Sequence, residues 1–167
     1  ALGIIGKSGR GLSINFKNSI NIISGTFGKS FGSGGAFLAC NEIISHKIIQ
    51  NSGAFRYTTA LAPTLAAAAL LSLKKIKENK NWGSELLNFS KRWKKEIIDL
   101  GNFKVRGECQ ILSIIIGEED ETLSIQKYLE ENGFLAIAIR PPTVPIGQSR
   151  IRITIKRSFN YIILDKF

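Results

Sequence analysis

Glycines crowd into one short segment near the start of the chain, directly after a run rich in isoleucine. Residues 19–24 (Ser-Ile-Asn-Ile-Ile-Ser) have the β-branched character of a strand, and residues 25–36 (Gly-Thr-Phe-Gly-Lys-Ser-Phe-Gly-Ser-Gly-Gly-Ala) follow as a loop. Glycine lets a backbone turn sharply and lets other groups approach it closely. The segment therefore predicts a strand that feeds a loop, and Lys29 lies inside that loop.

Segments typical of strands and helices alternate through the first part of the chain, which favours an α/β fold. Pro63 suits the first turn of a helix, where its missing N–H costs nothing, and Gly101 suits a helix end. We expect a strand over 36–40, a helix over 41–51, a strand over 54–59, a helix from Pro63 and a helix over 84–100. Apolar side chains at helical spacing predict a core-facing stripe on the last of these helices: Leu86, Phe89, Trp93, Ile97 and Leu100.

The periodicity changes after Gly101, and short apolar runs become more frequent. The expected elements are strands over 103–105, 111–116, 134–139 and 150–155, with a helix over 122–132 that Gly133 ends. This second part is expected to be a small α+β unit. The sequence thus predicts two parts, residues 1–101 and residues 102–167.

The chain carries 23 Lys and Arg residues against 13 Asp and Glu residues, for a formal net charge of +10. Its basic residues cluster on the expected helices among glutamates, without interleaved aromatic residues, which argues against a nucleic-acid partner. Cys40 and Cys109 are far apart and have no histidine at ligand spacing, so no metal site and no disulfide framework is expected. His46 is expected to be a surface or packing residue.

No stretch approaches the ~18 consecutive apolar residues of a membrane span, and the opening residues lack the features of a secretory signal. We therefore expect a soluble cytoplasmic protein with no membrane partner. The chain contains no methionine and opens with Ala-Leu-Gly, so we also expect a fragment or a truncated product.

The spacing of the glycine-rich loop argues against a loop that binds a nucleoside triphosphate. Residues 25–30 have two residues between the glycines, and residues 3–8 are short in the same way. The phosphate-binding pattern G-x-x-x-x-G-K-[ST] needs four, because its backbone N–H groups must surround the phosphates. Taken alone, residues 25–36 also fit a structural turn with a solvated Lys29.

Four runs in order along the chain resemble the α-oxoamine synthases, a family of pyridoxal-phosphate enzymes with the aspartate-aminotransferase fold (fold type I). The runs are residues 25–36, residues 56–63 (Arg-Tyr-Thr-Thr-Ala-Leu-Ala-Pro), residues 138–145 (Ala-Ile-Arg-Pro-Pro-Thr-Val-Pro) and residues 150–154 (Arg-Ile-Arg-Ile-Thr). The resemblance implies that residues 1–101 are the end of a large cofactor-binding α/β domain with connecting helices. It implies that residues 102–167 are the small C-terminal α+β domain.

The resemblance also implies roles for individual residues. Lys29 would bind pyridoxal phosphate covalently through its amine and then move protons at the substrate α-carbon. Thr26 would contact the cofactor phosphate. Two further threonines, Thr58 and Thr59, would reach the cofactor phosphate of the partner subunit in a homodimer.

Substrate contacts are implied for three residues of the second part. Arg152 is the first choice for the amino-acid carboxylate, because an arginine fork suits a carboxylate, and Arg140 is the second. Thr143 would contact the substrate, and Pro141 and Pro142 are expected to hold this segment rigid and extended. Taken alone, Arg152 also fits a solvated sheet face.

Residues 138–145 most resemble the members that condense L-alanine with a pimeloyl thioester in biotin biosynthesis, with the thioester on coenzyme A or on a carrier protein. Other members use glycine with an acetyl or succinyl thioester, and that alternative stays open. In the family, an Asp-Glu-Ala-His segment precedes the counterpart of Ala1-Leu2-Gly3, so upstream site residues are absent from this sequence. Residues 156–160 also depart from the usual His-Thr pattern, which leaves a noncatalytic or decayed fragment as a further alternative.

Overall fold

The computed structural model describes residues 2–16, 18–159 and 161–167, and the chain divides into two compact units. Unit 1 comprises residues 1–84 and unit 2 comprises residues 85–167. Within the described ranges, no helix is both long and apolar enough to cross a membrane.

The two units meet in the chain close to the beginning of helix α4 (Trp82–Gly101). The prediction places this whole helix in the first part, 1–101, whereas most of it belongs to unit 2. The assignment of a large and a small domain stays a prediction. Two residues of the analysed motifs, Ala1 and Asn160, lie outside the described part of the chain.

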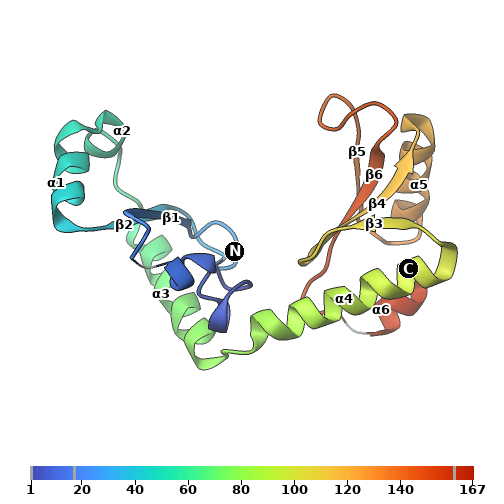
Figure 1. Cartoon of the computed structure of the whole chain (residues 1–167), viewed down its shortest axis with the longest axis horizontal. Coiled ribbons are helices and arrows are strands. Elements are labelled where there is room, and N and C mark those ends of the chain that lie inside the picture. The colour runs from blue at the N-terminus through green and yellow to red at the C-terminus, as the bar shows by residue number, and fades with distance from the viewer. Residues whose placement is uncertain (1, 17, 160) are drawn as a thin grey trace. The chain divides into compact units, whose positions relative to one another are not determined.

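The strands of unit 1 form an antiparallel hairpin. Strand β1 (Ile22–Thr26) pairs with strand β2 (Ala36–Cys40), so that Thr26 lies opposite Ala36 at the loop end (Figure 1). The strand β2 has its predicted bounds, while β1 begins and ends later than the predicted 19–24. The pair is antiparallel because the connection at 27–35 is too short for the crossover that parallel strands need.

Helices complete unit 1, and one of them corrects a prediction. The segment 54–59 was expected to be a strand, but a short helix, α2 (Gly53–Arg56), begins there instead. The side chain of Ser52 accepts a hydrogen bond from the Phe55 N–H at 3.3 Å, so a serine cap starts the helix. The other elements are η1 (Lys7–Gly9), η2 (Leu12–Phe16), α1 (Glu42–Asn51) and α3 (Pro63–Glu78).

Unit 2 is built on a four-stranded antiparallel sheet in the order β3-β4-β6-β5 (Figure 1). Its strands are β3 (Lys104–Arg106), β4 (Ile111–Gly117), β5 (Ile137–Ile139) and β6 (Ser149–Thr154), and its further helices are α5 (Glu119–Glu131) and α6 (Tyr161–Lys166). All four predicted strands and the predicted helix are confirmed with shifted ends. Alternate side chains of β4 and β6, such as Leu112 and Ile151, are buried on one face.

The apolar stripe of α4 forms much of the core of unit 2. Leu86, Trp93 and Ile97 are buried as predicted, and the ring of Trp93 lies 5.5 Å from that of Phe167. Leu100 is 80% exposed, so its predicted place in the core is wrong. It lies at the end of the helix, beyond the part of α4 that the core covers.

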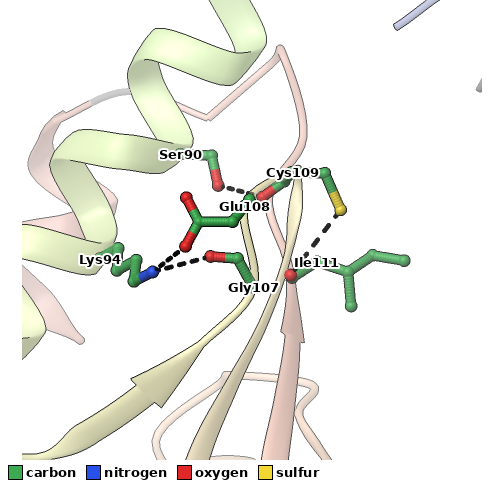
Figure 2. Close-up of polar contacts among 6 residues, drawn as sticks. All are labelled: Ser90, Lys94, Gly107, Glu108, Cys109 and Ile111. Atoms are coloured by element: carbon green, nitrogen blue, oxygen red, sulfur yellow. Dashed lines mark hydrogen bonds and ion pairs between the residues drawn. The ribbon is translucent and has the colours of Figure 1, made fainter. Parts of the chain in front are cut away.

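Polar side chains of α4 hold the turn between β3 and β4. The buried Ser90 hydroxyl donates to the Cys109 carbonyl at 2.6 Å, and one helical turn later the Lys94 ammonium donates to the Gly107 carbonyl at 3.0 Å (Figure 2). Lys94 also lies 2.5 Å from the Glu108 carboxylate. These contacts fasten residues 107–109 to one face of the helix.

Candidate functional site

The loop that carries Lys29 is a compact turn with internal backbone hydrogen bonds. The Gly32 N–H donates to the Lys29 carbonyl at 2.9 Å, and Gly32 has a φ of 58°, which favours glycine. Across the base of the loop, the Phe27 N–H donates to Gly35 and the Ser33 N–H donates to Phe27, both at 2.9 Å. Lys29 is therefore held by a defined backbone.

Three side-chain hydrogen bonds fasten this loop to the rest of unit 1. The Ser30 hydroxyl donates to the Leu2 carbonyl at 2.6 Å, and the Ser33 hydroxyl donates to Leu65 of α3 at 2.7 Å. A third bond runs the other way, because Ser72 of α3 donates to the loop carbonyl of Phe31 at 2.7 Å.

The side chain of Phe31 is buried, and its ring lies 5.3 Å from that of Phe27. These anchors were not predicted from the sequence. The signal for them was present, because serines and an aromatic residue stand directly beside the lysine.

Lys29 itself is exposed, and no hydrogen bond or ion pair holds its amine among the residues that the structure describes. A side chain at Gly32 would meet no atom within 4 Å, and one at Gly28 would approach the Thr26 hydroxyl at 3.4 Å. The loop that carries the exposed amine thus has open space at Gly32. This arrangement fits the attachment of a bulky aldehyde such as pyridoxal phosphate.

Thr26 ends β1 next to this lysine. Its hydroxyl donates to the Gly35 carbonyl at 3.3 Å and accepts from the Gly28 N–H at 3.1 Å. A hydroxyl has one proton, so the Thr26 hydroxyl could donate to a phosphate only by giving up its hydrogen bond to the Gly35 carbonyl. Its contact with a cofactor phosphate stays a prediction.

Thr58 and Thr59 lie in the exposed, irregular segment between α2 and α3. Both are exposed, and neither hydroxyl makes a hydrogen bond within the described ranges. Hydroxyls in this condition are available to a ligand or to another subunit. Their predicted role at a dimer interface is untested.

Arg140 and Thr143 lie at the two ends of a turn that follows β5. The Thr143 N–H donates to the Arg140 carbonyl at 3.0 Å, and the Pro141–Pro142 peptide bond is cis. The expectation of an extended segment is therefore wrong, because prolines at both central positions accommodate a closed turn. The Arg140 guanidinium lies 2.5 Å from the Glu119 carboxylate at the start of α5, so part of its fork is already occupied.

Arg152 lies on β6, on the sheet face opposite the buried Ile151 and Ile153. In the ladder it is opposite Ser113 of β4 and Ile137 of β5. Its side chain is exposed and has no hydrogen bond or ion pair in the described part of the chain. The guanidinium is thus available for a carboxylate, but its role as a substrate residue stays a prediction.

The structure groups the predicted site residues in two sets. One set lies in unit 1, with Thr26 and Lys29 three residues apart in one loop and Thr58 and Thr59 in an exposed segment. The other set lies in unit 2, where Arg140, Thr143 and Arg152 come from the last two strands and the turn between them.

Solved structures share the fold of this chain. Serine palmitoyltransferase of Sphingomonas wittichii superposes with a TM-score of 0.89 at 23% identity, over 99% of this chain and 43% of its own. The 8-amino-7-oxononanoate synthase of Francisella tularensis superposes with a TM-score of 0.85 at 25% identity, over 99% of this chain and 50% of its own. The chain therefore has the α/β fold of the C-terminal part of fold type I pyridoxal-phosphate enzymes.

The family match of the sequence agrees with the fold. The chain belongs to the aminotransferase class I and II family, whose model matches residues 5–160. Enzymes of this family use pyridoxal phosphate, and a related serine palmitoyltransferase has been solved with it. The predicted resemblance to the α-oxoamine synthases is confirmed.

Several curated relatives are named 8-amino-7-oxononanoate synthase. An 8-amino-7-oxononanoate synthase of Alkalilimnicola ehrlichii is 36% identical over 92% of this chain and 40% of its own length. That of Marinobacter nauticus is 32% identical over 99% of this chain and 43% of its own. The chain thus spans about two fifths of the length of these relatives and is related to pyridoxal-phosphate-dependent acyltransferases.

Proposed function

We propose that a complete protein containing this chain condenses L-alanine with a pimeloyl thioester to form 8-amino-7-oxononanoate. The observation that carries the proposal is the exposed amine of Lys29 on an anchored glycine loop, in a chain whose curated relatives bear the name of that synthase. The 167 residues alone are expected to be inactive, because the upstream Asp-Glu-Ala-His segment of the family is not among them.

Lys29 would bind the cofactor and then serve as the acid and base at the α-carbon of the amino acid. Pyridoxal phosphate supplies a conjugated ring that accepts the electron pair released at that carbon. The hydrogen bonds of Ser30 and Ser33 fix the backbone that follows Lys29, so the amine would return to one place after each proton transfer.

The available guanidinium of Arg152 would bind the alanine carboxylate and orient the α-carbon, while Thr143 would contact the acyl substrate. Arg140 is the weaker candidate for the carboxylate, because Glu119 already pairs with it. Thr58 and Thr59 would contact the cofactor phosphate in the partner subunit of a homodimer.

The attachment is tested in the complete protein by borohydride reduction with pyridoxal phosphate, followed by peptide mass mapping. We expect the label on Lys29 and its loss in Lys29→Ala, which should also abolish turnover. The variant Lys47→Ala is the control, because Lys47 is also exposed in unit 1 but lies on α1. A label on another lysine with none on Lys29 would contradict the proposal.

Substrate choice is tested by pairing alanine, glycine and serine with pimeloyl, acetyl, succinyl and palmitoyl thioesters. We expect the highest kcat/KM for alanine with the pimeloyl thioester. Glycine should react more slowly and not be excluded, since one methyl group separates substrates by only ~1–3 kcal/mol. Faster turnover of glycine with acetyl or succinyl thioester would reject this substrate and leave the family membership intact.

A further inference from the structure

A cavity of about 510 Å³ lies within unit 2, at the end of the ladder between β5 and β6 (Figure 1). The final register pair at this end is Ile137 with Arg152, and the residues beyond it line the cavity instead of pairing. Residues of α4 and α6 complete the lining. The volume falls in the range of roughly 300–1,000 Å³ that is usual for small-molecule sites.

The β6 side of the cavity offers a backbone donor. The Ile155 N–H donates to the Gln110 carbonyl at 2.8 Å, on the side of β6 that faces β4. Since neighbouring residues of an antiparallel strand direct their backbone groups to opposite sides, the N–H of Thr154 is directed toward the side of β5. Strand β5 begins only at Ile137, so Thr154 has no strand partner there among the described residues. Its N–H is therefore available to an acceptor in the cavity that Thr154 lines.

The charges around the cavity all have one sign. Arg152 and Lys156 of the β6 segment and Lys166 of α6 line it, and none of its described lining residues is acidic. These three side chains have no ion-pair partner within the part of the chain that the structure describes. Cations that the protein does not neutralise attract a ligand with an anionic group.

Most of the remaining wall is apolar, and half of its main members are aromatic: Phe134, Ile153, Ile155, Phe159, Ile163 and Phe167. Trp93 lines the cavity too, and its Nε1–H is buried without an acceptor among the described residues. A buried N–H in this condition is uncommon, because it loses its hydrogen bond to water and gains none in return. The wall thus combines apolar surface with unpaired donors and cations, and a ligand that matches it has an apolar body and an anionic acceptor.

We propose that this cavity binds an apolar chain that ends in a carboxylate, such as a medium-chain fatty acid. The chain fills the aromatic part of the cavity, while the carboxylate accepts from the Thr154 N–H and pairs with Lys156 and Lys166. A small anion without an apolar body would leave the aromatic wall without a contact. The proposal does not rest on the proposed function, and its test leaves Arg152 unchanged.

Octanoate is the probe, and isothermal titration calorimetry measures its binding to the whole chain. Octanol and octylammonium have the same chain with a neutral and a positive head group. We expect octanoate to bind about tenfold or more tightly than octanol, and octylammonium to bind most weakly. In a heteronuclear NMR spectrum, octanoate should shift the indole N–H signal of Trp93 more than that of Trp82, with Trp82→Phe as the assignment control.

A pair of matched variants locates the site. Leu135→Glu adds a carboxylate to the cavity wall at a residue that is 88% exposed, so the fold should be kept. Ile146→Glu makes the same charge change at a 92% exposed residue of unit 2 outside that wall. We expect the first to weaken octanoate binding by about tenfold or more and the second by less than about twofold.

A second pair tests the cations. Lys156→Gln/Lys166→Gln removes two charges from the wall, and Lys91→Gln/Lys95→Gln removes two from exposed residues of α4 outside it. Only the first should weaken binding by about tenfold or more. Circular dichroism checks the folding of every variant, and the lysine pair decides if Leu135→Glu does not fold.

Three results would overturn the proposal. Octanol bound as tightly as octanoate would show that the cations take no part. Equal losses within each matched pair would show that net charge, and not the cavity, governs binding. Absence of octanoate binding to the whole chain would show that the cavity does not accept this class of ligand. Failure of the pimeloyl assay has no bearing on any of them.

Discussion

The two units of the chain bury their apolar side chains to different extents. Among the described residues of unit 1, the buried hydrophobic side chains are Phe31 and Ala69, while all others lie in unit 2. Large apolar side chains of unit 1 stay exposed instead, including Leu38, Phe55 and Leu71 at more than half of their area. Unit 2 thus has a core of its own, whereas unit 1 relies on hydrogen bonds that fasten its loops.

The first prediction separates the two units, and its expected effect is the largest. Residues 82–167 keep α4 and the whole sheet, so they should unfold cooperatively when heated. Residues 1–81 should show no cooperative transition, because so little apolar area is buried there. Thermal unfolding followed by circular dichroism would measure both, with the whole chain as control. A cooperative transition in residues 1–81 would break the comparison.

The second prediction concerns the core of unit 2. Trp93 is 2% exposed and contacts the rings of Phe159 and Phe167. Trp93→Ala should lower the free energy of unfolding by about 3–5 kcal/mol, because it leaves a large cavity. Denaturant unfolding gives the value. Leu100→Ala, at an 80% exposed position of the same helix, should change it by less than about 0.5 kcal/mol.

The third prediction concerns the serine under the turn of Figure 2. Ser90→Ala leaves the Cys109 carbonyl without its partner next to the core, so it should cost about 1–3 kcal/mol of unfolding free energy. The matched control is Ser124→Ala, since the exposed Ser124 hydroxyl donates to Asp120 within α5. A loss as large in the control as in Ser90→Ala would show that the buried hydrogen bond is not the cause.

The fourth prediction has the smallest effect and depends on pH. The hydrogen bond and the charge of Lys94 lower the pKa of Glu108 below its usual 4.5. A carboxyl group whose pKa is lower in the folded state adds stability above its unfolded pKa, and this is lost as pH falls through the folded value. Glu108→Gln should therefore lower the melting temperature slightly at pH 7, and the difference should shrink below about pH 4.5. A difference that stays constant down to pH 2 would contradict this account.

Secondary structure was predicted more accurately from the sequence in unit 2 than in unit 1. In unit 2, alternating apolar residues and helical spacing predicted all four strands and helix α5, because a buried core imposes those periods, whereas the short helix α6 was not predicted. In unit 1, the segment 54–59 was wrongly predicted to be a strand. A serine cap starts a helix there, and with little core around it the apolar pattern did not decide the local structure.

The sequence predicted which residues could form the candidate site, but it did not predict which of them contact one another. Lys29 and its glycines could be found from the sequence, since the loop needs small residues beside a reactive amine. Glu119 as the partner of Arg140 could not, because 21 residues separate them along the chain. The cavity that Arg10 and Lys77 both line could not be predicted either, since these residues are far apart along the chain and come together through the packing of the N-terminal segment on α3.

Because Trp93 is buried in unit 2, tryptophan fluorescence can distinguish the two units. The chain has two tryptophans, and the other, Trp82, is half-buried at the first residue of α4. An indole surrounded by aromatic rings emits at shorter wavelength than one that touches water. Emission of a Trp82→Phe variant would report the core of unit 2 alone, and that of Trp93→Phe would report the junction between the units.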